Sequence, residues 1–113
     1  VKIDKYNNDI KSLLNAVLAL KNINECWKFL RDLLTEPEIK EFANRWKVAR
    51  MLDQKISYEK IEKVTGMSST TIARVNKWLA NGKGGYKLML KRLRNDNWRY
   101  TNISAVEYGK IIY

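Results

Sequence analysis

The chain of 113 residues carries 22 Lys and Arg against 12 Asp and Glu, a net charge of +10 that favours a polyanionic partner such as nucleic acid. This length predicts a single domain. With no His and one Cys, Cys26, a single chain has no means of forming a disulfide framework or a Cys/His zinc site, and we predict neither a metal nor an enzymatic activity.

The sequence shows no sign of a membrane segment. No apolar run reaches the ~18–20 residues that cross a bilayer, and the first residues lack the apolar stretch of a secretory signal. We therefore expect a cytoplasmic protein without a membrane partner. Apolar residues make up 45% of the chain, which is enough to build a core.

Two amphipathic helices are predicted in the first third of the chain. Residues 4–21 and a segment that begins at Asn22 or Asn24 both repeat the i, i+3, i+4, i+7 spacing of an apolar helix face. The apolar positions are Ile10, Leu13, Leu14, Val17 and Leu18 in the first segment, and Ile23, Cys26, Trp27, Leu30, Leu33 and Leu34 in the second. Cys26 lies on this face, so we interpret it as a packed thiol.

A third helix is predicted from Thr35 to about Gln54. Thr35 can cap it, Pro37 fits its donor-free first turn, and Glu38 completes a capping box. Between residues 46 and 52 the helix is apolar on nearly every side. Such a helix is covered on more than one side, and a second chain could supply part of the cover.

Shorter helices follow this long one. The sequence predicts helices over 57–64 and 68–79, separated by Thr65-Gly66-Met67, and a last helix over 86–94 after a Gly-rich loop. We assign residues 1–94 to one helical domain for DNA binding and dimerisation. Residues 95–113 form a tail without a clean period, whose aromatic residues could pack on the core or the dimer interface, or could stack on bases.

The segment 57–79 has the organisation of a helix-turn-helix. Ser57 caps the first helix, and Gly66 permits the left-handed backbone of a tight turn. Ile72, Val75 and Leu79 share one face of the second helix, which leaves a polar and basic face on the other side. A helix that enters the major groove of DNA needs such a face.

Small or basic side chains of this motif are the predicted DNA-binding residues. Hydroxyl groups at the start of the second helix allow a close approach to DNA, and the cations bind phosphates or base edges. These residues are Lys60, Lys63, Ser68, Ser69, Thr70, Thr71, Arg74 and Lys77. The alternative is that the hydroxyl groups only cap the helix and that Arg74 and Lys77 belong to an ordinary solvated face.

The distribution of charge favours the DNA-binding interpretation. Residues 1–40 have a net charge of +1, residues 41–94 have +9, and residues 95–113 have none. Nearly all of the excess positive charge therefore lies in the part of the chain that contains the motif.

From Leu30 to about Arg94 the chain resembles the tryptophan repressor superfamily, and the whole chain is most similar to its YerC/YecD branch. The resemblance is carried by LLTEPEIKEFANRWKVARML (33–52), similar to the family's "LLTPDER" helix start, and by GMSSTTIARVNKWL (66–79), similar to its recognition helix around "ATITR". The resemblance implies an all-α, intertwined homodimer that presents two helix-turn-helix units to a palindromic operator and represses transcription.

The resemblance also implies a ligand pair, Arg45 and Arg74, at the positions where the repressor's two arginines clamp its corepressor. The following residue, however, is Val75 where the repressor has Gly, and its side chain would intrude on the indole pocket. We therefore expect no tryptophan cofactor, and we leave open whether another small molecule binds. Glu59 and Glu62 also stand where the repressor has basic residues that contact DNA, so the operator sequence does not transfer.

The sequence thus predicts a homodimeric, sequence-specific regulator of double-stranded DNA that acts as a repressor. Two alternatives stay open. One is a protein-interaction module whose basic surface binds an acidic protein, and the other is a nucleic-acid binder without sequence preference.

Overall fold

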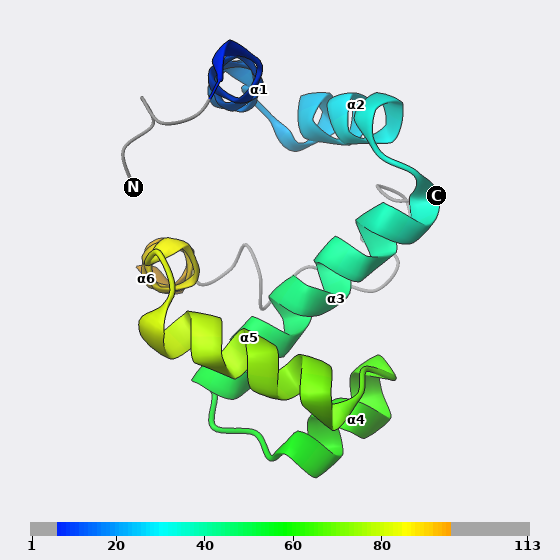
Figure 1. The fold of residues 1–113 in the computed structure, drawn as a ribbon, viewed down its shortest axis with the longest axis vertical. Helices are drawn as coiled ribbons and strands as arrows, with labels where there is room; N and C mark the ends of the chain where they lie inside the picture. Colours follow the sequence, from blue (N-terminus) through cyan, green and yellow to red (C-terminus); the bar gives the residue numbers. More distant parts are fainter. Residues whose placement is uncertain (1–6, 96–113) are drawn as a thin grey trace.

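The computed structural model describes residues 7–95, which form six α-helices and no strand (Figure 1), so the all-α prediction is confirmed. The helices are α1 (Asn8–Ala19), α2 (Ile23–Leu33), α3 (Glu36–Asp53), α4 (Tyr58–Thr65), α5 (Ser69–Asn81) and α6 (Gly85–Asn95). The first two helices form an N-terminal arm, and the long α3 joins this arm to the other three. Except for its first residue, the predicted tail lies outside the described residues.

Polar caps begin the first five helices. In each case a side-chain oxygen of the residue before the helix accepts a hydrogen bond from a backbone N–H of the first turn, a group that has no partner inside the helix. The capping residues are Asn7, Asn22, Thr35, Ser57 and Ser68. Of the two caps considered for the second helix, the structure therefore selects Asn22.

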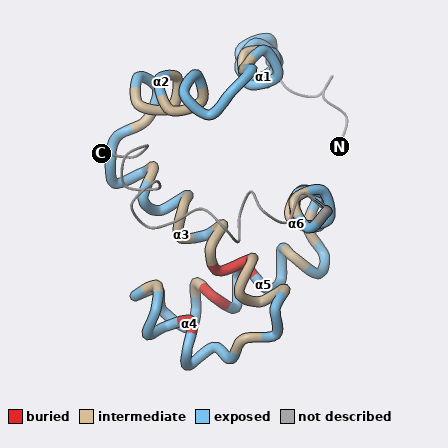
Figure 2. Tube along the Cα trace, turned by 180° about the vertical axis from the view of Figure 1, so that it is seen from behind, coloured by how far each residue is buried: buried red, intermediate tan, exposed pale blue. Residues whose placement is uncertain are grey.

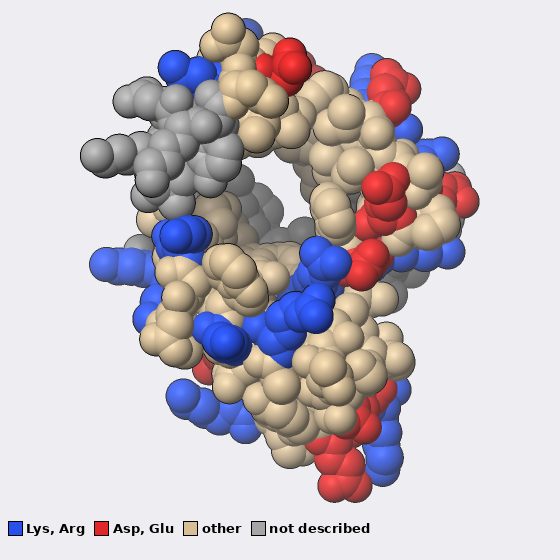
Figure 3. Space-filling model, in the orientation of Figure 1, with Lys and Arg blue, Asp and Glu red and all other residues tan. Residues whose placement is uncertain are grey.

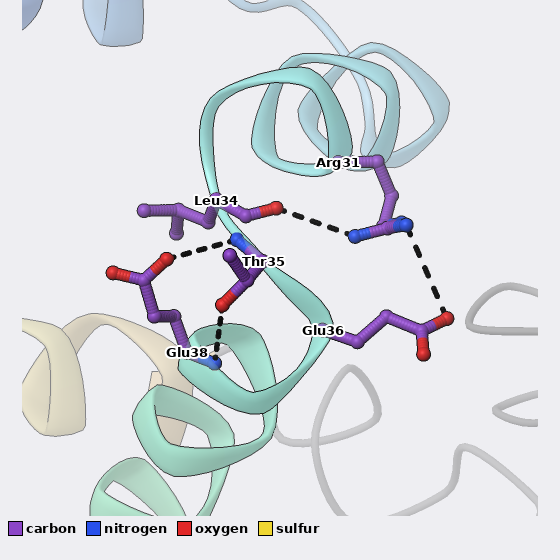
Figure 4. A network of polar contacts seen from close by, with 5 residues as sticks. All are labelled: Arg31, Leu34, Thr35, Glu36 and Glu38. Carbon is purple, nitrogen blue, oxygen red and sulfur yellow. Dashed lines mark hydrogen bonds and ion pairs between the residues drawn. The ribbon is translucent and has the colours of Figure 1, made fainter.

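The junction between α2 and α3 contains the predicted capping box (Figure 4). The Thr35 hydroxyl accepts from the Glu38 N–H at 3.3 Å, and the Glu38 carboxylate accepts from the Thr35 N–H at 2.9 Å. Arg31 of α2 donates to the Leu34 carbonyl at 3.3 Å and lies 4.0 Å from the carboxylate of Glu36. Side chains on both sides of the junction therefore hold the direction in which the arm leaves α3.

The core lies where α3, α4 and α5 meet (Figure 2). Each of these helices buries one apolar face in it, as the spacing predicts. Its buried members are Val48 and Ala49 of α3, Ile61 of α4, and Ile72 and Val75 of α5. α6 packs against α3 and α5 and buries Leu90.

The arm contributes nothing to this core. No residue of α1 or α2 is buried, and the apolar stripe of α1 is open to solvent in the single chain. Among the described residues, no helix is both long enough and apolar enough to cross a bilayer.

Two helices, α5 and α6, have boundaries that differ from the prediction in ways that matter for the site. α5 ends at Asn81 and not at Leu79, because no residue before Gly82 interrupts the helix. α6 begins at Gly85, one residue early, and ends at Asn95. The recognition face of α5 is therefore longer than the sequence prediction allowed.

Candidate nucleic-acid interface

The turn between α4 and α5 is fixed by local hydrogen bonds. The Thr65 hydroxyl donates to the Ile61 carbonyl at 2.7 Å and accepts from the Met67 N–H at 3.2 Å. Gly66 between them has φ of 72°, in the left-handed region where a Cβ costs energy. The segment 57–79 thus adopts the order helix, tight turn, helix that the sequence predicts.

The inner face of α5 anchors its outer face. Ile72 is fully buried and Val75 is 4% exposed, whereas Thr70, Arg74 and Lys77 are exposed on the opposite side. The outer face contains a shallow hollow of about 480 Å³, which is lined by Thr70, Ala73, Arg74, Lys77, Trp78 and Asn81. The predicted polar and basic face therefore exists and is held by the core.

The hydroxyl groups at the start of α5 divide into two pairs. Ser68 accepts from the Thr71 N–H at 3.2 Å, and its hydroxyl lies 3.1 Å from the Thr71 hydroxyl. These two side chains therefore serve the helix cap, as the alternative interpretation proposed. Ser69 and Thr70 lie in the first turn of the helix with their side chains exposed.

Two members of the outer face, Trp78 and Asn81, were absent from the predicted site. They follow Arg74 and Lys77 by four residues each, so helical spacing alone would have found Trp78, which lies inside the predicted helix, whereas Asn81 lies beyond its predicted end. The Trp78 ring packs over the backbone at Gly82, where a Cβ would collide with that ring and with the Trp78 carbonyl. The absence of a side chain at Gly82 therefore leaves the space that the Trp78 ring occupies.

The basic residues of α4 have a different setting. Lys60 and Lys63 are exposed, as predicted, but Glu59 and Glu62 are exposed on the same short helix and cancel their charge. Neither lysine lines the hollow on α5. Figure 3 shows the same contrast, because Lys and Arg side chains gather over α5 and α6, whereas side chains of both signs lie together on the arm, along the first part of α3 and on α4.

Comparison with known proteins identifies the family. The Trp repressor protein family matches residues 8–94. The chain belongs to the Trp repressor family. YerC of Bacillus subtilis (strain 168), which is described as uncharacterized, is 41% identical over 95 residues, which cover 83% of this chain and 91% of YerC.

Two solved structures agree with this family. A TrpR-like protein from Eubacterium eligens has 37% identity and a TM-score of 0.75 over 77% of this chain and 90% of its own. A putative Trp repressor from Staphylococcus aureus has 36% identity and a TM-score of 0.76 over 83% of this chain and 95% of its own. The predicted resemblance, including the YerC branch, is confirmed, and the Trp repressor family is one of DNA-binding regulators and not of enzymes.

The predicted ligand pair, Arg45 and Arg74, does not meet in the hollow on α5. The Arg45 guanidinium lies 2.9 Å from the Glu41 carboxylate and 5.7 Å from the centre of the Phe42 ring, both on its own helix. Arg74 lines the hollow on α5 without Arg45. Val75 is part of the core, so its side chain fills space where the family's corepressor-binding repressor has only a glycine.

A second hollow, about 460 Å³ in volume, opens on the other side of Trp78. It is lined by Trp46, Trp78, Lys83, Gly85, Tyr86 and Met89, from α3, α5, α6 and the loop before α6. Trp46 and Tyr86 stack in it, with ring centres 6.4 Å apart and planes within 10°. Most of its wall is aromatic or apolar, so it is a surface that water solvates poorly.

Proposed function

We propose that this protein is a sequence-specific regulator of double-stranded DNA that acts as a homodimeric repressor. The proposal is carried by one observation, the exposed face of Thr70, Arg74 and Lys77 on a helix whose opposite face is locked in the core. A rigid helix with such a face can enter a major groove about 12 Å wide. Membership of the Trp repressor family supports the same function.

Within this proposal the side chains have separate roles. Arg74 reads base edges, because its guanidinium can donate two parallel hydrogen bonds to guanine. Ser69 and Thr70 approach the groove, while Ser68 and Thr71 keep the helix N-terminus in shape and bring its N–H groups near phosphate. Lys60, Lys63 and Lys77 bind phosphates and supply affinity without sequence preference.

The test is selection of bound duplexes from a random pool, followed by affinity measurements on the selected and a random duplex at ~150 mM salt. Arg74→Ala should lower the preference for the selected duplex by about 1–3 kcal/mol, whereas Lys28→Ala, on the arm, should leave it unchanged. Equal affinity for both duplexes would leave a nucleic-acid binder without sequence preference. Absence of any salt-sensitive binding would favour the protein-interaction module.

The homodimer part of the proposal is supported by the apolar surface that one chain leaves uncovered. The α1 stripe, with Leu14 41% and Leu18 82% exposed, and the aromatic hollow at Trp46 and Tyr86 both require cover. A second copy would cover them and would supply a second α5 for a palindromic site. Sedimentation should show a dimer at micromolar concentration, and a monomer there would reject this part.

The proposal includes no tryptophan corepressor, because Val75 fills core space and Arg45 has partners on its own helix. Selection of duplexes with and without metabolite extract would reveal another effector. The same proposal includes a cytoplasmic location, because a regulator of transcription must reach the DNA.

A further inference from the structure

Positive charge continues along the chain past the recognition helix, in a segment that has no acidic residue of its own. Residues 63–95 contain no Asp or Glu. Their basic residues are Lys63, Arg74, Lys77, Lys83, Lys87, Lys91, Arg92 and Arg94. An ordinary solvated surface mixes the two signs, so this segment is suited to a polyanion.

The cations beyond α5 have defined positions. Lys87 donates from its ammonium to the Ala80 carbonyl at 3.1 Å, which places a positive charge at the C-terminal end of α5. Lys91 follows one turn later on the same flank of α6, and Lys83 lies in the loop between the two helices. All three side chains are exposed, whereas Arg94 pairs with Asp53 at 2.7 Å.

The contact of Lys87 with Ala80 has an electrostatic consequence. The carbonyl groups at a helix C-terminus carry a partial negative charge, which repels phosphate. Lys87 neutralises this charge with one of its three N–H donors and keeps the others for a further partner. The end of α5 can therefore lie close to a phosphate backbone.

The length of α5 brings this end to the edge of the groove. Its 13 residues span about 20 Å, and the major groove is about 12 Å wide. When the N-terminal half of α5 lies in the groove, its C-terminal end and the start of α6 reach the flanking backbone. On this side of α5 the loop and α6 contain no Asp or Glu, whereas α4 on the other side carries as many carboxylates as lysines.

We propose that Lys83, Lys87 and Lys91 form a phosphate-binding ridge, the α6 ridge, which contacts the duplex backbone outside the groove that α5 enters. This inference rests on the proposed DNA-binding function and adds a second contact surface to it. It also assigns the main backbone contacts to the helix after the helix-turn-helix, while the first helix of the motif plays a smaller part.

The test compares two double variants of the full chain. Lys83→Gln with Lys91→Gln removes two charges of the ridge and leaves the Lys87 contact intact, and Lys21→Gln with Lys28→Gln removes two exposed charges near the arm. Affinity for the selected and the random duplex is measured by fluorescence anisotropy between 50 and 200 mM salt. The ridge variant should lose about 2 from the slope of log affinity against log salt and about tenfold in affinity for both duplexes.

A second readout uses the DNA. Removing base pairs that flank the selected site should weaken wild-type binding and should weaken the ridge variant much less, because its backbone contact is already lost. If the ridge variant keeps the wild-type slope while the wild type prefers the selected duplex, the ridge is rejected and the proposed function stands. If the wild type binds no duplex, both fail together.

Discussion

The N-terminal arm and the unit of α3 to α6 have the same kind of apolar spacing and very different burial. In α5, Ile72 is fully buried and Val75 almost so. In α1, Leu13, Leu14 and Val17 occupy equivalent stripe positions and are between 41% and 49% exposed. The period of 3.6 residues is thus equally clear in both helices, but only one of them finds its cover within the chain.

The difference shows what apolar spacing can and cannot predict. Spacing identifies the face that must leave water, since burying one large apolar side chain is worth about 1.5–3 kcal/mol. It does not identify the surface that covers this face. For α5 that surface is α3 and α4, whereas α2 packs on the beginning of the long α3 and α1 lies beyond it.

The largest effect on stability is expected from a cavity in the core of the unit of α3 to α6. Ile72→Ala should lower the free energy of unfolding by about 2–5 kcal/mol, because Ile72 is enclosed by side chains of α3 and α4 and the cavity cannot fully collapse. Urea unfolding followed by circular dichroism measures this loss. The loss should be the same at every protein concentration, and a loss that shrinks as protein is added would place Ile72 at an intermolecular contact.

A similar deletion in the arm should change self-association, so its effect should depend on protein concentration. Leu14→Ala should weaken self-association by about 1.5–3 kcal/mol, which is tenfold or more in the dissociation constant, if a second copy buries this side chain. Sedimentation across a dilution series measures the change, with Ser12→Ala, an exposed position on the same helix, as the control. An unchanged association constant would show that Leu14 lies outside the dimer interface.

A smaller effect is expected at the turn of the helix-turn-helix. Gly66→Ala should cost about 1–2 kcal/mol, because φ is 72° there while a Cβ at this position meets no atom within 4 Å. The cost is therefore one of backbone conformation and not of packing. Urea unfolding measures it, and a loss below a few tenths of a kcal/mol would show that the turn relaxes into another conformation.

Much of the fold could be predicted because its signals are local. The cap at Thr35 and the turn at Gly66 each depend on four or five consecutive residues, and the structure contains both. The end of α5 is harder to predict, since Ala80 favours a helix and Asn81 does not forbid one, so the sequence before Gly82 does not mark where the helix ends. The contact between Lys87 and Ala80, which stabilises that end, joins residues seven apart and belongs to the packing of α6.

The candidate site was predictable to the same extent. Thr70, Arg74 and Lys77 follow from the spacing of the buried positions, and the structure places all three on one exposed face. The neutral setting of Lys60 and Lys63 follows from the neighbouring glutamates, but its importance is clear only beside α5 and α6, which contain no Asp or Glu. The partners of Arg45 depend on side-chain conformation, which a linear pattern does not contain.

The smallest effect on stability is expected at the junction between α2 and α3, and this effect depends on pH. The Thr35 backbone N–H, and then the Thr35 side chain, hold the pKa of Glu38 below its ordinary value of 4.5. A carboxylate with a lowered pKa in the folded state stabilises the protein fully above its unfolded pKa, and this contribution is lost as pH falls through the folded pKa.

Glu38→Gln should therefore destabilise the protein at pH 7 and have progressively less effect below pH of about 4.5. Urea unfolding at several pH values measures this, with Glu62→Gln on α4 as the control. A Glu38→Gln effect that stayed constant across this range would show that the charge of the Glu38 carboxylate does not stabilise the junction, and that the Thr35 hydroxyl caps α3 without it.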